Sequence, residues 1–352
     1  MSPAAKRLIK NWAAGAVVGT LLIAVTSPLF VRSYLPDQFD EARQVSVPSP
    51  NANYRWRSEG YATTRIGPHG MPGRRELPNE TQTRIALWGD SQAEGVCVAD
   101  DEKLFAKLNV PNRAAVLPLA RSGDDLHDWL KQIPAVEKNL GVDAHVLLIV
   151  DLSDLHSAQT DDSHEMPSAA NHDFQSSIAK YMPAFVIQSV RNLMTDNSGY
   201  ARRLRFGVGP VTSLCAVIPA DEKYVQGVTQ RELIDWDQPL GLLRGATRKP
   251  IAIVYAPKSI AAKQDSDLPP SVGEIPRDTD QMAIWQLANS ASSHGIIFHD
   301  ASEALARLAK KGTPPHGFHN GQIGQGHFNA AGYQAIAGEI KPIVANIVEP
   351  QE

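Results

Sequence analysis

The chain of 352 residues is long enough to bury a full hydrophobic core, as one large domain or two small ones. Its composition, 43% hydrophobic and 20% charged, is typical of a folded globular protein. The net charge of −4, with no arginine-lysine cluster and no interleaved aromatic stripe, argues against a nucleic-acid partner.

The first predicted element is an uncharged apolar segment, residues 11–31. As a helix rising ~1.5 Å per residue it would reach about 31 Å, enough to cross the hydrocarbon core of a membrane. Three basic side chains lie within residues 1–10, and positive charge on this short side keeps it in the cytoplasm. We therefore predict a transmembrane anchor, with everything after Arg32 outside the cytoplasm, in the periplasm of a bacterium. A cleaved signal peptide is the alternative, and it would export the same part of the chain.

Residues 32–80 lack a regular pattern. The stretches VPSPNANYRW and RIGPHGMPGRRELPNE are rich in turn formers, and their Gly and Pro residues stand too close together for a long helix or strand. We interpret residues 32–80 as a stalk and an irregular lead-in to a domain that spans residues 81–348.

From residue 84 onward, short apolar runs alternate with helical patterns. Continuous apolar runs of this length suit strands that are buried on both faces of a parallel sheet. The five predicted strands are residues 84–88, 114–120, 144–152, 250–257 and 295–300, and the last helix is predicted at residues 330–348. The alternation predicts an α/β fold, a doubly wound (flavodoxin-like) parallel β-sheet flanked by helices.

The connection over residues 156–245 is too long for a simple crossover. Residues 178–194 within it carry apolar side chains at helical spacing, which predicts a helical insertion beside the sheet. The favoured interpretation is that this stripe faces the core, rather than a membrane or a partner.

Two polar sites stand at the ends of the predicted domain. Ser91 closes the first strand in the sequence ALWGDSQAEG, and His327 lies in a glycine-rich loop just before the last helix. A serine needs a base to become a nucleophile, and loops that follow the strands of a doubly wound sheet gather at one edge. His327 could therefore reach Ser91. The structural alternative for Ser91 is a simple β-turn, and Asp90 is expected to bond the local backbone.

These stretches resemble two sequence blocks of the SGNH hydrolases, also called the GDSL esterase/lipase superfamily. ALWGDSQAEGVCVADDEKLF is similar to their first block, and GHFNAAGY is similar to the last block, in which a histidine precedes an Asn and a Gly at the start of the terminal helix. The preceding GPHGMPGRRE resembles a segment found in exported bacterial members. The resemblance covers about residues 60–348 and is weakest through the insertion.

The resemblance implies a role for four residues. Ser91 matches the nucleophile, whose backbone N–H would be one oxyanion donor, and His327 matches the general base. Gly123 matches the glycine of the second block, a further backbone donor. Ser153 stands where the family usually has an asparagine, and its hydroxyl reaches less far than a carboxamide.

The acid that normally orients the histidine is missing from its usual place. The position three residues before His327 is Gly324. We therefore predict a Ser–His dyad, with the outer ring nitrogen held by a backbone carbonyl of residues 320–326 or by a nearby polar side chain. A neutral acceptor would make turnover slow, and Gly324→Asp could raise the activity. Asp124, which has acid-x-x-His spacing, is interpreted as belonging to a helix cap or to the surface.

The sequence gives no reason to expect a cofactor. His316 and His319 lie near His327 and could shape the pocket, but their spacing fits no zinc motif, so no metal is predicted. The two cysteines, Cys97 and Cys215, could pair in an exported protein, or Cys97 could act as a small core residue.

The resulting hypothesis is a membrane-anchored, extracytoplasmic serine esterase that hydrolyses short acyl esters. The location and the resemblance favour acetyl groups on an acylated small molecule or a polysaccharide. Two alternatives stay open: an O-acetyltransferase that acts on extracellular glycan, and a glycan-binding domain without turnover, for which Gly324 and Ser153 are the best support.

Overall fold

The computed structural model describes residues on both sides of the large insertion and the last part of the insertion itself. The described residues are 2–30, 33, 35–57, 59–79, 81–155, 235–257, 277–320, 323–324 and 326–348. The predicted helical insertion, including residues 178–194, therefore lies almost wholly outside the described residues.

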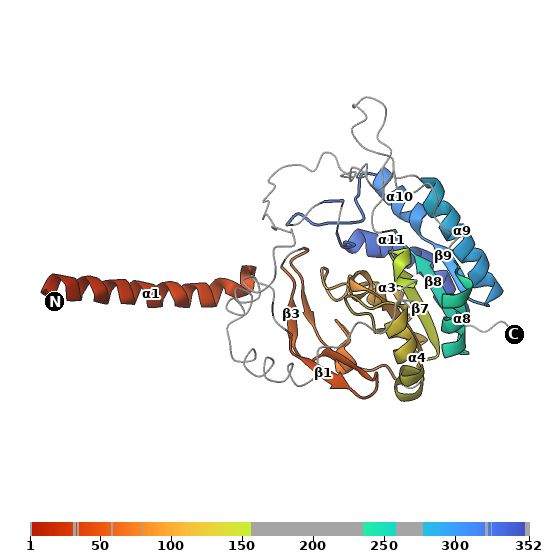
Figure 1. Cartoon of the computed structure of the whole chain (residues 1–352), viewed down its shortest axis with the longest axis horizontal. Coiled ribbons are helices and arrows are strands. Elements are labelled where there is room, and N and C mark those ends of the chain that lie inside the picture. Colours follow the sequence, from red (N-terminus) through yellow and green to blue (C-terminus); the bar gives the residue numbers. More distant parts are fainter. Residues whose placement is uncertain are drawn as a thin grey trace, which may run out of the picture.

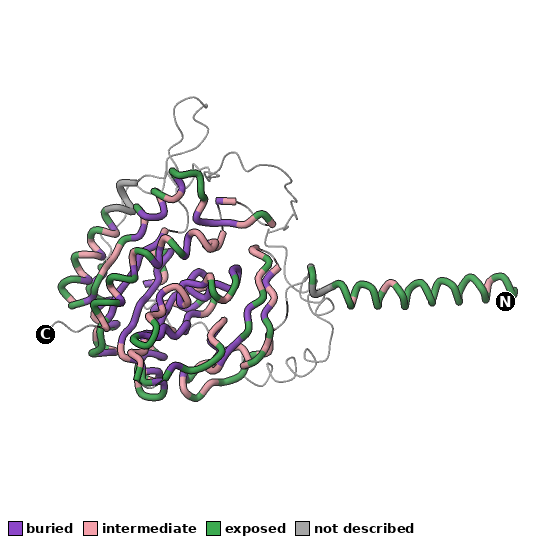
Figure 2. The backbone as a smooth tube through the Cα atoms, turned by 180° about the vertical axis from the view of Figure 1, so that it is seen from behind, coloured by how far each residue is buried: buried purple, intermediate pink, exposed green. Residues whose placement is uncertain are grey.

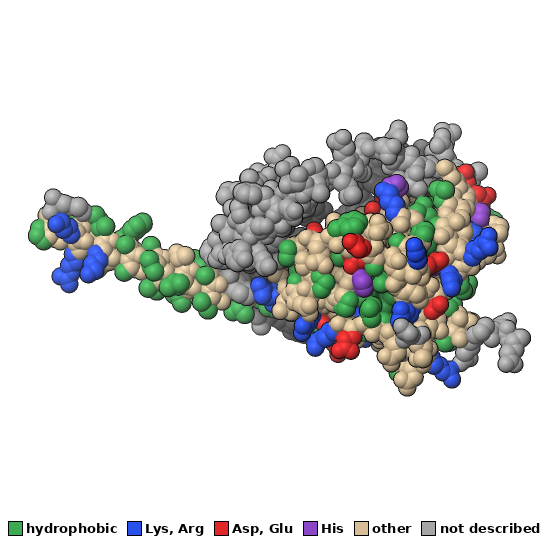
Figure 3. Space-filling model, turned by 90° about the horizontal axis from the view of Figure 1, so that it is seen from below, with side chains coloured by type: hydrophobic (Ala, Val, Ile, Leu, Met, Phe, Trp, Pro, Cys, Tyr) green, Lys and Arg blue, Asp and Glu red, His purple; other side chains and the backbone are tan. Residues whose placement is uncertain are grey.

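The N-terminal segment is one long helix, α1 (Pro3–Phe30), which begins earlier than residues 11–31. It projects from one side of the rest of the protein (Figure 1) and is exposed along its length (Figure 2). Apolar side chains cover it, and Lys and Arg gather near its N-terminal end (Figure 3). Residues Pro3–Thr26 are long and apolar enough to cross a membrane, a test that a signal sequence also passes.

The lead-in contains two short antiparallel hairpins rather than wholly irregular chain. The first pairs β1 (Asp37–Asp40) with β2 (Val45–Pro48), and the second pairs β3 (Asn53–Arg55) with β4 (Thr63–Arg65). Ser33 joins the end of α1 to the second hairpin, because its backbone N–H donates to the Arg55 carbonyl at 3.1 Å. These hairpins matter for function, because the loop of the second one enters the candidate active site.

The main sheet has five strands, all parallel, in the order β6-β5-β7-β8-β9. Their bounds are β5 (Thr83–Gly89), β6 (Ala114–Pro118), β7 (Ala144–Ile149), β8 (Ile251–Tyr255) and β9 (Ile297–Asp300). In chain order this is 2-1-3-4-5, the flavodoxin-like arrangement. Every residue of β6, β7 and β8 is buried, which explains their unbroken apolar sequences. The predicted fold class is confirmed.

Helices cover both faces of this sheet (Figure 1). Successive β5 residues point to opposite faces, so that Leu87 packs in one core cluster and Trp88 in the other. The Leu87 side holds α2 (Ser91–Glu94), α3 (Leu104–Leu108), α10 (Ser302–Lys310) and α11 (Ala330–Val348). The Trp88 side holds α4 (Leu126–Leu140), α8 (Asp237–Ala246) and α9 (Arg277–Ser293). β5 lies between two other strands, so it is not an edge strand. Its carboxyl end is part of the row formed by the carboxyl ends of the strands, where ligands of such folds bind.

Candidate active site

Ser91 is the first residue of α2, two residues after the end of strand β5. The Asp90 carboxylate caps this short helix by accepting from the Gln92 backbone N–H at 2.8 Å. Asp90 thus bonds local backbone, as predicted. The turn from strand to helix presents the Ser91 side chain at the carboxyl edge of the sheet, partly accessible to solvent.

His327 reaches Ser91 from the loop before α11. Its Nε2 lies 3.0 Å from Ser91 Oγ, so the predicted proximity of the two side chains is observed. Gln92 fixes the histidine loop from both sides of His327. Its amide oxygen accepts from the Phe328 N–H at 2.9 Å, and its amide nitrogen donates to the Gly326 carbonyl at 3.3 Å. A residue next to Ser91 therefore holds both neighbours of His327.

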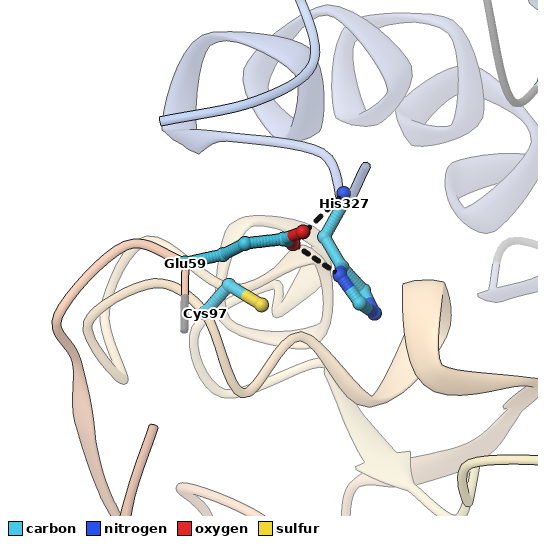
Figure 4. Close-up of side chains that lie close together, drawn as sticks. All are labelled: Glu59, Cys97 and His327. Atoms are coloured by element: carbon cyan, nitrogen blue, oxygen red, sulfur yellow. Dashed lines mark hydrogen bonds and ion pairs between the residues drawn. The ribbon is translucent and has the colours of Figure 1, made fainter. Parts of the chain in front are cut away.

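The outer nitrogen of His327 does have a carboxylate partner, so the predicted dyad is wrong. Glu59 Oε2 lies 2.6 Å from His327 Nδ1, and the same oxygen accepts from the His327 backbone N–H at 3.2 Å (Figure 4). A side-chain carboxylate thus occupies the outer nitrogen, where the sequence predicted a neutral acceptor. Ser91, His327 and Glu59 form a hydrogen-bonded chain with the spacing of a Ser-His-acid triad.

Glu59 comes from the loop between β3 and β4, and two contacts explain how it arrives there. The Asn320 side chain accepts from the Gly60 N–H at 2.9 Å and donates to the Arg57 carbonyl at 3.4 Å, which ties this loop to the segment before His327. Gly326 lets the carboxylate approach, since a Cβ there would lie 2.7 Å from Glu59 Oε1. Gly326 also has a φ of +87°, which favours glycine.

Gly123 and Ser153 follow the two strands that flank β5. Gly123 is exposed in the loop between β6 and α4. Ser153 is exposed in the 3₁₀ turn Leu152–Leu155, and its hydroxyl donates to Asp151 Oδ1 at 2.8 Å. Their oxyanion roles stay predictions.

A buried polar network supports the Gly123 loop. Asp124 is buried, and Arg121 donates to its two carboxylate oxygens at 3.0 and 2.6 Å. Burial raises the pKa of Asp124 to about 6, although Arg121 lowers it. Arg43, from the turn of the first hairpin, is fully buried and donates to Gln132 Oε1 at 2.8 Å. Arg43 thus joins the first hairpin to α4, the helix that follows the Gly123 loop.

His316 is buried beneath the histidine loop, and its ring lies 4.3 Å from that of Phe328. Burial lowers its pKa to about 4, so it is neutral at neutral pH. His319 is exposed. His316 supports the loop of His327, because its carbonyl accepts from the Gly324 N–H at 2.9 Å.

The one group of described residues with metal-ligating atoms gathered together overlaps this site. Ligand atoms of Glu59, Cys97 and His327 all lie within 4.8 Å of one another (Figure 4). Cys97 is buried, and Cys215, its possible disulfide partner, lies outside the described residues.

Comparison with known proteins gives matches of fold. No protein-family model and no curated protein matches the chain. Similar solved structures include an extracellular lipase from Streptomyces rimosus, with 15% identity and a TM-score of 0.39, covering 76% of this chain and 100% of that one. A GDSL-like lipase from Bacteroides thetaiotaomicron has 10% identity and a TM-score of 0.35, covering 77% and 92%. A carbohydrate acetylesterase family member from Sinorhizobium meliloti has 12% identity and a TM-score of 0.34, covering 76% and 99%. These structural neighbours are hydrolases by their names.

Proposed function

We propose that the chain is a serine esterase of the SGNH type, with Ser91 as nucleophile and His327 as general base. The observation that carries the proposal is the position of His327, 3.0 Å from Ser91 Oγ on one ring nitrogen and 2.6 Å from Glu59 on the other. A base within hydrogen-bond reach of a serine, oriented in turn by a carboxylate, is the arrangement that activates a serine for acyl transfer.

In the proposed reaction, Ser91 Oγ attacks the ester carbonyl while His327 Nε2 takes the hydroxyl proton. Glu59 accepts from Nδ1–H, which keeps Nε2 free as the base and stabilises the imidazolium that forms. Backbone N–H groups of Ser91 and Gly123 would donate to the oxyanion, with the Ser153 hydroxyl as a third donor. His327 then protonates the departing alcohol, and water releases the acyl group from Ser91 by the reverse sequence.

The proposed substrate class is a short acyl ester, such as an acetyl group on a polysaccharide outside the cytoplasm. The apolar helix α1 would act as the membrane anchor that holds the esterase there. A C-terminal alkaline phosphatase fusion tests the topology: activity is expected on export, and an inactive fusion on a stable protein would overturn it.

The full-length protein in detergent, incubated with a fluorophosphonate probe and with p-nitrophenyl acetate, tests the chemistry. We expect the probe to label Ser91 and the wild type to hydrolyse the ester, with both signals absent in Ser91→Ala. Equal labelling of both proteins would place the reactive serine elsewhere. A lack of labelling and of hydrolysis in the wild type would favour the glycan-binding alternative. That alternative was supported in part by the missing acid at Gly324, and Glu59 supplies a carboxylate in its place.

A further inference from the structure

Cys97 lies beside the bond between Glu59 and His327 but has no part in the proposed ester hydrolysis. Its side chain is fully buried in a small cluster with Tyr54, Trp56 and Ile66. The sulfur nevertheless points toward the carboxylate and the imidazole (Figure 4), and one ligand atom of each of the three residues lies within 4.8 Å of the other two.

The main chain fixes this sulfur relative to the carboxylate. The loop that carries Glu59 packs directly on the backbone at Cys97, since a Cβ on Gly60 would lie 1.9 Å from the Cys97 carbonyl oxygen. The Cys97 side chain itself is sealed from solvent, whereas the side chains of His327 and Glu59 are 18% and 25% exposed. A small ion could therefore enter past the partly exposed side chains of His327 and Glu59 and reach the buried sulfur behind them.

Thiolate, imidazole and carboxylate are the three protein ligand types that zinc prefers. Bonds of about 2.0–2.3 Å in a tetrahedral site separate neighbouring ligand atoms by roughly 3.3–3.8 Å. The sulfur is close enough to reach this spacing by a small adjustment. Glu59 and His327 Nδ1, now 2.6 Å apart, would have to separate by about an ångström to admit the ion.

We propose that Glu59, Cys97 and His327 form an inhibitory site for Zn²⁺, with a water as fourth ligand. A metal on Nδ1 takes the lone pair there and leaves the single proton of the neutral imidazole on Nε2. Nε2 would then donate toward Ser91 and could not accept the hydroxyl proton. Cys97 loses its thiol proton to solvent on binding, because the thiolate is the ligand. The inhibition rests on the proposed esterase function, whereas the binding of the metal does not.

Binding is tested on the full-length protein with Cd²⁺, because a thiolate bound to Cd²⁺ absorbs in the ultraviolet by charge transfer. We expect the wild type and Cys215→Ala to show this band at one equivalent of Cd²⁺, and Cys97→Ala and Cys97→Ser to lack it. Zn²⁺ should remove the band by competition. Circular dichroism of both Cys97 variants identifies any loss of fold, and a band that persists in a folded Cys97 variant would overturn the site.

Inhibition is tested separately by p-nitrophenyl acetate hydrolysis. Zn²⁺ should inhibit the wild type, a chelator should restore the activity, and Cys97→Ala should need at least roughly tenfold more Zn²⁺, the lower limit for losing even a supporting residue of a metal site. Equal inhibition of both proteins would overturn the proposal. An enzyme that is inactive without metal but still shows the Cd²⁺ band would contradict the esterase function and leave the metal site standing, so the two failures are distinguishable.

Discussion

The two sides of the candidate active site are built in different ways. Ser91 is the first residue of α2, two residues after the end of the seven-residue strand β5, whose last five residues are buried. Glu59 instead stands in the loop between two three-residue strands, β3 and β4, outside the sheet. Its position depends on a few contacts that cross between regions, above all those of Asn320.

The comparison indicates a division of labour. The α/β sheet brings Ser91 and His327 together, and the hairpin supplies the carboxylate that bonds the outer nitrogen of His327. Ser33 also joins this hairpin to the end of α1, through hydrogen bonds to the carbonyls of Arg55 and Asn53 at 3.1 Å each. Substitutions in the hairpin and beside Ser91 can therefore separate the two contributions to catalysis.

Glu59→Gln gives the largest expected effect. The amide keeps the size of the side chain but offers no charge to stabilise the imidazolium, and its nitrogen favours the wrong tautomer of His327. We expect kcat to fall by about 10³–10⁴-fold with little change in KM, measured by p-nitrophenyl acetate hydrolysis.

Gly324→Asp is the matched test of the alternative position for the acid. Because Glu59 already occupies Nδ1, this variant should not raise the activity of the wild type. A rise in the wild type, or a Glu59→Gln enzyme that keeps full activity, would show that the hairpin is dispensable.

The two regions also differ in how far the sequence predicts them. Ser91 and His327 could be found because each adjoins a long regular element, β5 or α11, and parallel topology brings such loops to one edge. The five strands were found for the same reason, since unbroken apolar runs mark strands buried on both faces.

Glu59 could not be found in this way. Its flanking strands are too short to show alternation, and the Glu-Gly pair in RSEGYATT indicates at most a turn. Its position in the fold depends on a contact between Gly60 and Asn320, which are 260 residues apart. No local sequence pattern predicts such a contact. The family's usual acid position falls on Gly324 in this chain, in a different loop from the one that carries Glu59.

Gly326→Ala should separate the two regions without touching a reacting group. The new methyl group would lie 2.7 Å from Glu59 Oε1 and push the carboxylate away from His327. We expect about a 10²-fold loss of kcat, the cost of roughly an ångström of misplacement.

Gly312→Ala is the matched control for backbone strain. Gly312 has a φ of +83°, close to the +87° of Gly326, but a Cβ there would meet nothing within 4 Å. Both variants should lose about 1 kcal/mol of stability in urea unfolding. If both also lose activity equally, the contact with Glu59 is not the cause.

Gln92→Met tests the sheet side in the same manner. Methionine has a similar length but cannot bond the Phe328 N–H or the Gly326 carbonyl, so the histidine loop loses both ties. We expect roughly a tenfold loss of kcat and about 1–3 kcal/mol of stability, because two backbone groups are left without their partners. Gln92→Glu, which can still accept from Phe328, should retain more of both. Unchanged kcat in Gln92→Met would mean that the loop is positioned by other contacts.

The smallest effect is confined to stability and concerns the network where the first hairpin meets the Gly123 loop. Burial raises the pKa of Asp124 from 3.8 to about 6 in the folded state. Between these values the folded protein binds more protons at this site than the unfolded chain does, so stability falls as pH rises from about 4 to 6. The rise in pKa corresponds to at most about 3 kcal/mol.

Asp124→Asn removes this titration and keeps the shape of the side chain. The free energy of unfolding of Asp124→Asn minus that of the wild type should therefore increase from pH 4 to 6 and stay constant above pH 7. Urea titrations at fixed ionic strength measure this difference. A difference that moves the opposite way would mean that Arg121, which donates to both carboxylate oxygens, outweighs burial and keeps Asp124 ionised. In that case an ionised Asp124 would attract both Arg121 and the buried Arg43. Charge, rather than a protonated and hydrogen-bonded acid, would then hold the first hairpin and the Gly123 loop together.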